Sequence, residues 1–108
     1  MINVATQQRK KLFIINISGD LTKEFVTINL LNKCTHWVQQ HPSTRIDCTQ
    51  LKKIDCAGLS FLLECHQQAL QQEHSCTLQL NKDLAAYSSI YLTLKQRTTL
   101  YDSNTTTT

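Results

Sequence analysis

The tetrapeptide Asp55-Cys56-Ala57-Gly58 brings together the residue types of this sequence best suited to chemistry or recognition. Aspartate is a good helix N-cap, because its carboxylate accepts hydrogen bonds from backbone N–H groups that a first helical turn leaves unsatisfied. A helix starting near Cys56 is predicted by apolar residues at helical spacing, namely Leu59, Leu62, Leu63, Ala69 and Leu70. Any group held by the tetrapeptide would lie at the positive end of the helix dipole. We therefore expect the tetrapeptide to be the functional surface.

The cysteines do not favour a metal site or a thiol enzyme. The five of them are an odd number, each in an apolar or strand-like segment, which indicates reduced thiols in a cytoplasmic protein. No C-x-x-C pair is present, and neither Cys65-His66 nor Cys34 with His36 has the spacing of a zinc site. A catalytic Cys56 would need a nearby base, and His66 lies too far along the same helix. We expect no metal, no cofactor and no catalysis, with every cysteine except Cys56 buried as a small hydrophobe.

Composition favours one compact domain without membrane spans. The chain has 108 residues, 41% of them hydrophobic, and a net charge of +3. It contains no apolar run of the roughly 18 residues that a transmembrane helix needs, and its first residues lack the apolar core of a signal peptide. The basic residues are scattered, which predicts a solvated surface and no nucleic-acid or lipid footprint. We expect a single domain over residues 1–101 and a disordered polar tail over 102–108.

Strands and helices are predicted to alternate along most of the chain. The expected strands cover 2–5, 11–18, 45–49, 75–80 and a short final segment at 98–101. The expected helices cover about 23–40 with Thr22 as N-cap, Cys56 to about Gln72, and a last one from Asn81 or Lys82 to about Leu94. Residues 6–10 and 50–55 are expected to be connectors. The first two strands are close enough to form an antiparallel hairpin, and the later ones, joined by helices, are expected to pair in parallel.

The fold class that follows is α/β, with a mixed four- to five-stranded sheet. The segments Ile46–Cys48 and Thr77–Leu80 alternate apolar and polar residues, whereas strands covered on both faces are apolar almost throughout. We therefore expect helices mainly on one face of the sheet and a second face partly open to solvent.

The arrangement and the segment IDCTQLKKIDCAGLSFLL resemble a STAS domain, the family of anti-sigma-factor antagonists. That family carries a hydrophobic-Asp-[Ser/Thr]-[Ser/Thr/Gly]-Gly-Leu motif at the start of its second helix. The Ser18-Gly19-Asp20-Leu21 segment and the run Ile90–Leu94 are similar to the STAS subunit of the Mla phospholipid-transport ABC complex. One departure matters: the hydroxyl that is phosphorylated in anti-sigma antagonists is replaced here by Cys56 and Ala57. In the Mla branch the matching position is a threonine that faces the ATPase subunit, and Cys56 takes its place.

The resemblance implies a non-catalytic subunit that binds the cytoplasmic ATPase of an ABC-type phospholipid transporter. It would be cytoplasmic, without direct membrane insertion, and held at the inner membrane through its complex. The residues expected to contact the ATPase are Lys52, Lys53, Asp55, Cys56, Ala57, Gly58, Ser60, Phe61 and Glu64. Phe61 falls off the expected core stripe, so it is either packed under the loop or an exposed interface anchor. The alternative function is an anti-sigma-factor antagonist, or a related partner-switching regulator, that lacks the usual phosphorylatable residue.

Overall fold

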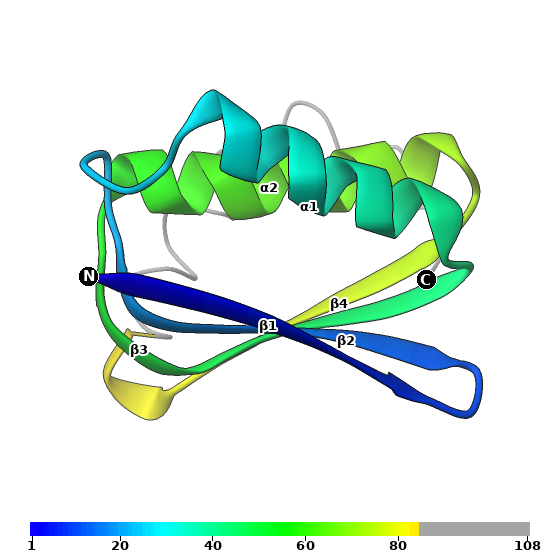
Figure 1. Ribbon diagram of the computed structural model, residues 1–108, viewed down its shortest axis with the longest axis horizontal. Helices are drawn as coiled ribbons and strands as arrows, with labels where there is room; N and C mark the ends of the chain where they lie inside the picture. Colours follow the sequence, from blue (N-terminus) through cyan, green and yellow to red (C-terminus); the bar gives the residue numbers. More distant parts are fainter. Residues whose placement is uncertain (85–108) are drawn as a thin grey trace.

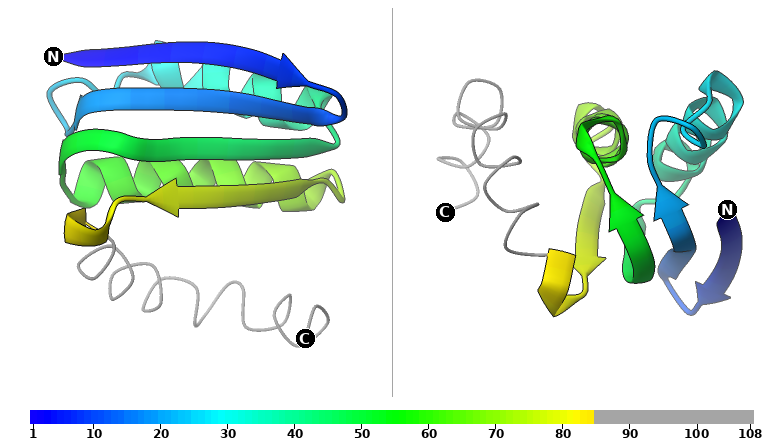
Figure 2. Two further views of the ribbon diagram at one scale, coloured as in Figure 1. Left: turned by 90° about the horizontal axis from the view of Figure 1, so that it is seen from below. Right: turned by 90° about the vertical axis from the view of Figure 1, so that its left-hand side faces the viewer.

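The computed structural model describes residues 1–84 and shows a four-stranded sheet in the order β1-β2-β3-β4. The elements, in chain order, are β1 (Ile2–Arg9), β2 (Leu12–Leu21), α1 (Ile28–Gln40), β3 (Ser43–Ile54), α2 (Cys56–Gln71) and β4 (Ser75–Leu80). β1 and β2 form an antiparallel hairpin, whereas β2, β3 and β4 run parallel. Both helices lie on the same face of the sheet, and the other face is left without a helix among the described elements (Figures 1 and 2). This confirms the predicted mixed sheet with helices on one face.

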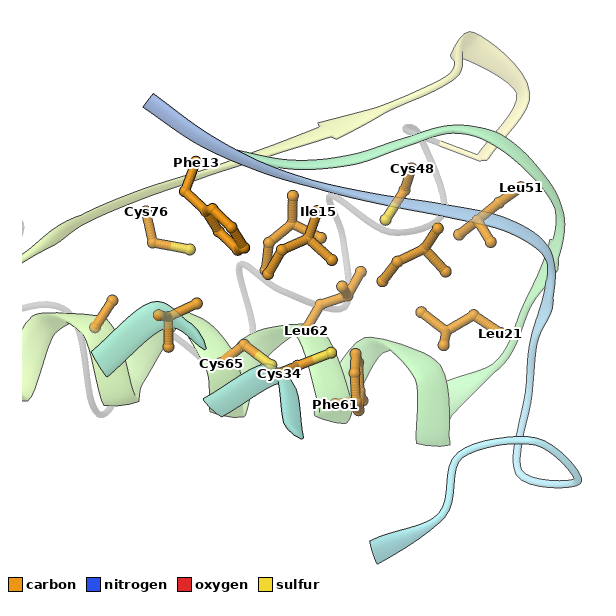
Figure 3. Packing of buried hydrophobic residues seen from close by; sticks show 14 residues of the cluster. Phe13, Ile15, Leu21, Cys34, Cys48, Leu51, Phe61, Leu62, Cys65 and Cys76 are labelled. Carbon is orange, nitrogen blue, oxygen red and sulfur yellow. The ribbon is translucent and has the colours of Figure 1, made fainter. Parts of the chain in front are cut away.

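The core lies between the sheet and the two helices, as Figure 3 shows. β2 contributes Phe13, Ile15 and Ile17, and all three are buried. The other core residues include Cys34 and Val38 of α1, Ile46 and Cys48 of β3, and Leu62, Cys65 and Ala69 of α2. The cysteines at 34, 48, 65 and 76 are buried and Cys56 is exposed, which confirms the distribution predicted from the sequence.

The hairpin is longer than its sequence predicts. β1 continues through the expected connector to Arg9, which pairs with Leu12 across a tight turn. Lys10 adopts a positive φ of 53° in that turn, a conformation that glycine adopts more readily. The turn contains neither Gly nor Pro, so the sequence gives no local signal for it. Pairing with Leu12 to Gly19 of β2 satisfies the β1 backbone, and this outweighs the weak strand propensity of the polar run in β1.

β3 is also longer than predicted. The segment 50–55 was expected to be a loop, but β3 continues to Ile54, which pairs with Leu21 of β2. Two register shifts between β2 and β3 allow this, one between Asn16 and Ser18 and one between Gly19 and Asp20. Bulges of this kind bend a strand without ending its pairing. Leu51, inside this segment, is buried in the core.

α1 begins five residues later than Thr22 would predict, because Thr27 is its N-cap. The Thr27 hydroxyl accepts a hydrogen bond from Leu30 N (3.1 Å). Thr22 instead closes a turn, with its carbonyl accepting from Phe25 N and Val26 N, both at 2.9 Å. Both threonines are acceptable caps in sequence, and the tertiary hydrogen bonds of the β2–α1 loop, described below, select the second.

Beyond β4, Asn81 Oδ1 accepts a hydrogen bond from Leu84 N (3.0 Å), and residues 82–84 are helical. This confirms the predicted start of a last helix. The remainder of that helix, the strand predicted at 98–101, the domain boundary at residue 101 and the tail at 102–108 lie outside the described residues. Within residues 1–84, no helix is long and apolar enough to cross a membrane.

Candidate functional site

The start of α2 has the geometry predicted for the Asp55-Cys56-Ala57-Gly58 tetrapeptide. Asp55 is the N-cap, in an extended conformation, and its Oδ1 accepts a hydrogen bond from Gly58 N (3.0 Å). Its carbonyl accepts the next helical bond from Leu59 N (2.9 Å). The carboxylate thus serves an N–H group that the first turn would otherwise leave unpaired.

Asp55 also connects this helix start to the β2–α1 loop. Its Oδ2 accepts a hydrogen bond from Lys23 N (2.9 Å), and its own N–H donates to Leu21 O (3.4 Å). The loop therefore lies beside the beginning of α2 at one end of the sheet (Figure 1). Local sequence patterns do not predict this contact, because Lys23 and Asp55 are 32 positions apart in the chain.

Gly58 allows the close approach of these two segments. A Cβ atom at this position would lie 2.1 Å from Leu21 O and 2.9 Å from Ile54 Cγ1. Both distances are far below normal contact, and the carbonyl oxygen belongs to backbone that cannot swing aside. The glycine of the motif is therefore required by packing against the end of β2, and not by an unusual φ angle.

The electrostatics of the site favour an ionised Asp55. Partial desolvation opposes ionisation, but hydrogen bonds from the backbone N–H groups of Lys23, Gly58 and Ala57 outweigh it and lower the pKa of the carboxyl. The carboxylate is consequently charged at neutral pH and holds both segments in place. Lys52 and Lys53, at the end of β3, are exposed beside it.

The predicted contact residues differ in exposure. Lys52, Lys53, Cys56 and Ser60 are exposed, and Asp55, Ala57 and Glu64 are half-buried. Gly58 is buried against Leu21 and contributes through its position. Lys52 and Lys53 lie on a strand, because β3 replaces the expected loop.

Of the two placements expected for Phe61, the exposed interface anchor on the flank of α2 is wrong. Phe61 is only 2% exposed and belongs to the main core cluster (Figure 3). Helix α1 packs beside α2, which widens the buried sector of α2 beyond the stripe expected for packing on a sheet alone. Leu62 and Leu63, predicted to be buried, are 0% and 9% exposed.

One exposed apolar side chain was not singled out from the sequence. Ile28, the first residue of α1, is 70% exposed and follows the loop that Asp55 holds. The later start of α1 places it in the first helical turn, on the outer side. A single exposed isoleucine is ordinary on a protein surface, so its exposure alone is no sign of a binding site. Ile28 is included in the candidate surface only because it lies next to the loop that Asp55 holds.

Metal chemistry has no support in the part of the chain that the structure describes. Residues 1–84 contain no group of three or more His, Cys, Asp and Glu side chains that could hold a metal ion. Burial raises the pKa of the Cys48 thiol to about 12 and that of Cys76 to about 11, so both stay protonated at neutral pH.

Comparison with known proteins gives one family. Residues 4–88 match the family model described as "Mlab, STAS domain". No curated protein matches the chain significantly in sequence.

Among solved structures, an anti-sigma factor antagonist from Mycobacterium paratuberculosis is 18% identical, with a TM-score of 0.68 over 98% of this chain and 93% of that one. The anti-sigma factor antagonist SpoIIAA, in its unphosphorylated form, is 14% identical, with a TM-score of 0.57 over 70% and 71% of the two chains. An antisigma-factor antagonist STAS domain from Rhodobacter sphaeroides is 9% identical, with a TM-score of 0.50 over 74% and 85%. At these identities the structures establish a shared fold.

Proposed function

This chain belongs to the STAS family, and from that premise we propose that it is a non-catalytic subunit that binds the cytoplasmic ATPase of an ABC-type phospholipid transporter. The transporter would maintain the lipid asymmetry of an outer membrane. The protein would be cytoplasmic and would reach the inner membrane only through its complex. STAS domains generally act as regulators or scaffolds through protein–protein contacts, and this role is of that kind.

The observation that carries the proposal is the match of residues 4–88 to the family model described as "Mlab, STAS domain". The chemistry of the helix start supports it. Neither Cys56 nor Ala57 has a hydroxyl group, so a serine or threonine kinase has no acceptor at the motif positions that anti-sigma antagonists use. A constitutive docking surface needs no such acceptor.

The proposed docking surface has a small, weakly polar centre and a basic edge. Cys56 and Ala57 form the centre, and Lys52 and Lys53 form the edge. Ser60 and Glu64 follow on the same helix. Asp55 and Gly58 hold the surface in shape, and Phe61 is left out because its side chain is buried. The partner surface should accordingly be apolar opposite Cys56 and acidic around it.

A carboxylate at position 56 tests the docking surface. Cys56→Glu should leave the fold intact, because a negative charge at a helix N-terminus is favourable. Burying that charge against an apolar partner should abolish the complex. The measurement is recovery of the ATPase subunit with tagged, folded protein. Gln71→Glu, at the exposed far end of α2, is the matched control and should bind like wild type. Equal recovery with Cys56→Glu and wild type would contradict the assignment of Cys56.

The second candidate is a partner-switching regulator, which is favoured by the anti-sigma antagonists among the structural neighbours. If the protein is such a regulator, the tagged chain should capture an anti-sigma factor and no ABC ATPase. Co-purification of the tagged full chain from its native cell, followed by mass spectrometry, separates the two functions.

A further inference from the structure

The helix-free face of the sheet carries a polar hollow that the docking surface does not use. It has a volume of about 410 Å³ and lies across β1, β2 and β3, the three strands seen uncovered on the left of Figure 2. Polar side chains from all three strands line it: Asn3, Asn16, Ser18, Asp47, Thr49 and Gln50. Ala5 of β1, directly opposite Asn16, leaves the space open because its side chain is only a methyl group.

The hollow lies where the pairing of β2 and β3 is irregular. Asn16 pairs with Asp47, but Ser18 pairs with Gln50, so β3 has one extra residue in this interval. Bulges re-aim side chains and are common beside functional sites. Here Thr49 folds back on Asp47, with its N–H and its hydroxyl donating to Asp47 Oδ1 at 3.0 and 2.6 Å.

Several groups in the hollow have unused hydrogen-bonding capacity. Within residues 1–84, no hydrogen bond reaches Asp47 Oδ2, and none engages the side-chain polar atoms of Asn3, Asn16, Ser18 or Gln50. Asp47 is the charged residue among those lining the hollow. The hydrogen bonds from the Thr49 side chain and backbone lower the pKa of Asp47, so it is ionised at neutral pH. Arg45 interacts electrostatically with Asp47 but forms no ion pair with it in the described part of the chain.

We propose that this hollow binds a small primary ammonium compound, with the ammonium group on Asp47 Oδ2 and a neighbouring polar group on the amides and hydroxyls around it. A carboxylate next to amide oxygens suits an N–H donor that carries a positive charge. The lining residues include no Lys or Arg, and the one charged side chain among them is the Asp47 carboxylate, which would repel an anionic ligand. They include no aromatic ring either, so a quaternary ammonium would lack the cation–π contact that it needs.

Ethanolamine is a suitable probe, and ethylene glycol is its uncharged counterpart of the same size. We expect ethanolamine to shift the backbone amide NMR signals of Asn16, Ser18 and Asp47 in the isotope-labelled full chain, with a Kd of about 1–10 mM for so small a ligand. Ethylene glycol, choline and phosphoethanolamine should each bind at least about tenfold more weakly. The last of these separates a free amine from an ammonium group that carries a phosphate.

Two variants test the site itself. Asp47→Asn keeps an oxygen for Thr49 but removes the charge, and it should weaken ethanolamine binding at least about tenfold. Ala5→Leu should fill the hollow and abolish binding without changing the charge. Glu73→Gln, beyond the end of α2, removes an exposed carboxylate elsewhere and should bind like wild type.

Three outcomes of the ethanolamine experiments would overturn the proposal. They are equal binding of ethylene glycol, unchanged binding by folded Asp47→Asn, and signal shifts confined to residues outside the hollow. Ca²⁺ producing the same shifts at lower concentration would also reject it in favour of a metal site. None of these outcomes bears on the ATPase complex, because the hollow and the start of α2 use different residues.

Discussion

Each oxygen of the Asp55 carboxylate serves a different segment of the chain. Oδ1 caps α2 through Gly58 N, and Oδ2 holds the β2–α1 loop through Lys23 N. A cap alone contributes about 0.5–2 kcal/mol to the free energy of unfolding. The second bond gives Asp55 a further role, because it sets the position of the loop next to Cys56. The aspartate of the motif is therefore a positioning residue for the proposed docking surface.

At the residue scale, Gly58→Ala tests whether helix propensity or close packing determines the effect of this position on stability. On an unconstrained helix the change should stabilise the protein by about 1 kcal/mol. The contacts with Leu21 O and Ile54 Cγ1 predict the opposite sign, a destabilisation of about 1–3 kcal/mol from overpacking. Urea denaturation measures the difference. Gln71→Ala, exposed on the same helix, should change stability by less than about 0.5 kcal/mol. A stabilised Gly58→Ala variant would show that the two segments separate easily.

At the scale of the element, α2 is buried on a broad sector. It packs on the sheet and also against α1, so residues on two adjoining stripes are covered. Phe61 and Leu62 are consecutive in sequence, and both belong to the main core. The exposed side of α2 is correspondingly narrow. The proposed docking surface must therefore lie at the N-terminal end of the helix and along the stripe through Ser60 and Glu64.

Phe61→Ala tests this arrangement. If the ring is part of the core, its removal should cost about 3–5 kcal/mol of unfolding free energy. An exposed interface anchor would instead leave stability almost unchanged and weaken only the complex. Thermal and urea unfolding of the isolated chain decide between these results. Gln71→Ala, exposed on the same helix, is the control that reports the cost of a surface change.

At the scale of the whole molecule, the two faces of the sheet differ in chemical character. The helix-covered face holds the core and four buried cysteines, whereas the helix-free face presents polar side chains around the hollow at Asp47. The proposed docking surface lies at one end of the sheet, where the β2–α1 loop meets α2. A partner at that end would leave the helix-free face accessible.

The free energy of unfolding should decrease continuously as the pH falls from neutral into the acid range. Burial lowers the pKa of His66, so the unfolded chain binds its proton more readily and stability declines as the pH falls below about 6.5. The lowered pKa values of Asp47 and Asp55 act in the same direction. Their contribution is complete above the ordinary carboxyl pKa of about 4 and is lost as the pH falls through the folded values.

The measurement is the urea midpoint between pH 7.5 and pH 3. His66→Gln should remove the decline between pH 7.5 and 5.5 and leave the decline below pH 4. His36→Gln, on the exposed side of α1, is the control and should retain both. A wild-type midpoint that rises on acidification to pH 5.5 would contradict the prediction.

Local patterns in the sequence determined much of this molecule. The alternation of β3 and β4, the cap at Asp55, the start of α2 and the burial of four cysteines all followed from neighbouring residues. Each depends on interactions within one strand or one helical turn, so the physical cause is contained in a short segment. The order of the elements follows from these local patterns, and the helices on one face follow from the alternating strands.

Tertiary structure decided the features that depend on contacts between distant segments. Lys23 N claims the second oxygen of Asp55, and α1 begins at Thr27. Packing of α1 beside α2 buries Phe61, which the spacing of α2 alone places off the core. Pairing with β2 extends β3 to Ile54, and the irregularity in that pairing opens the hollow at Asp47. In each case the deciding partner is remote in sequence, and a single helical or strand period contains no information about it.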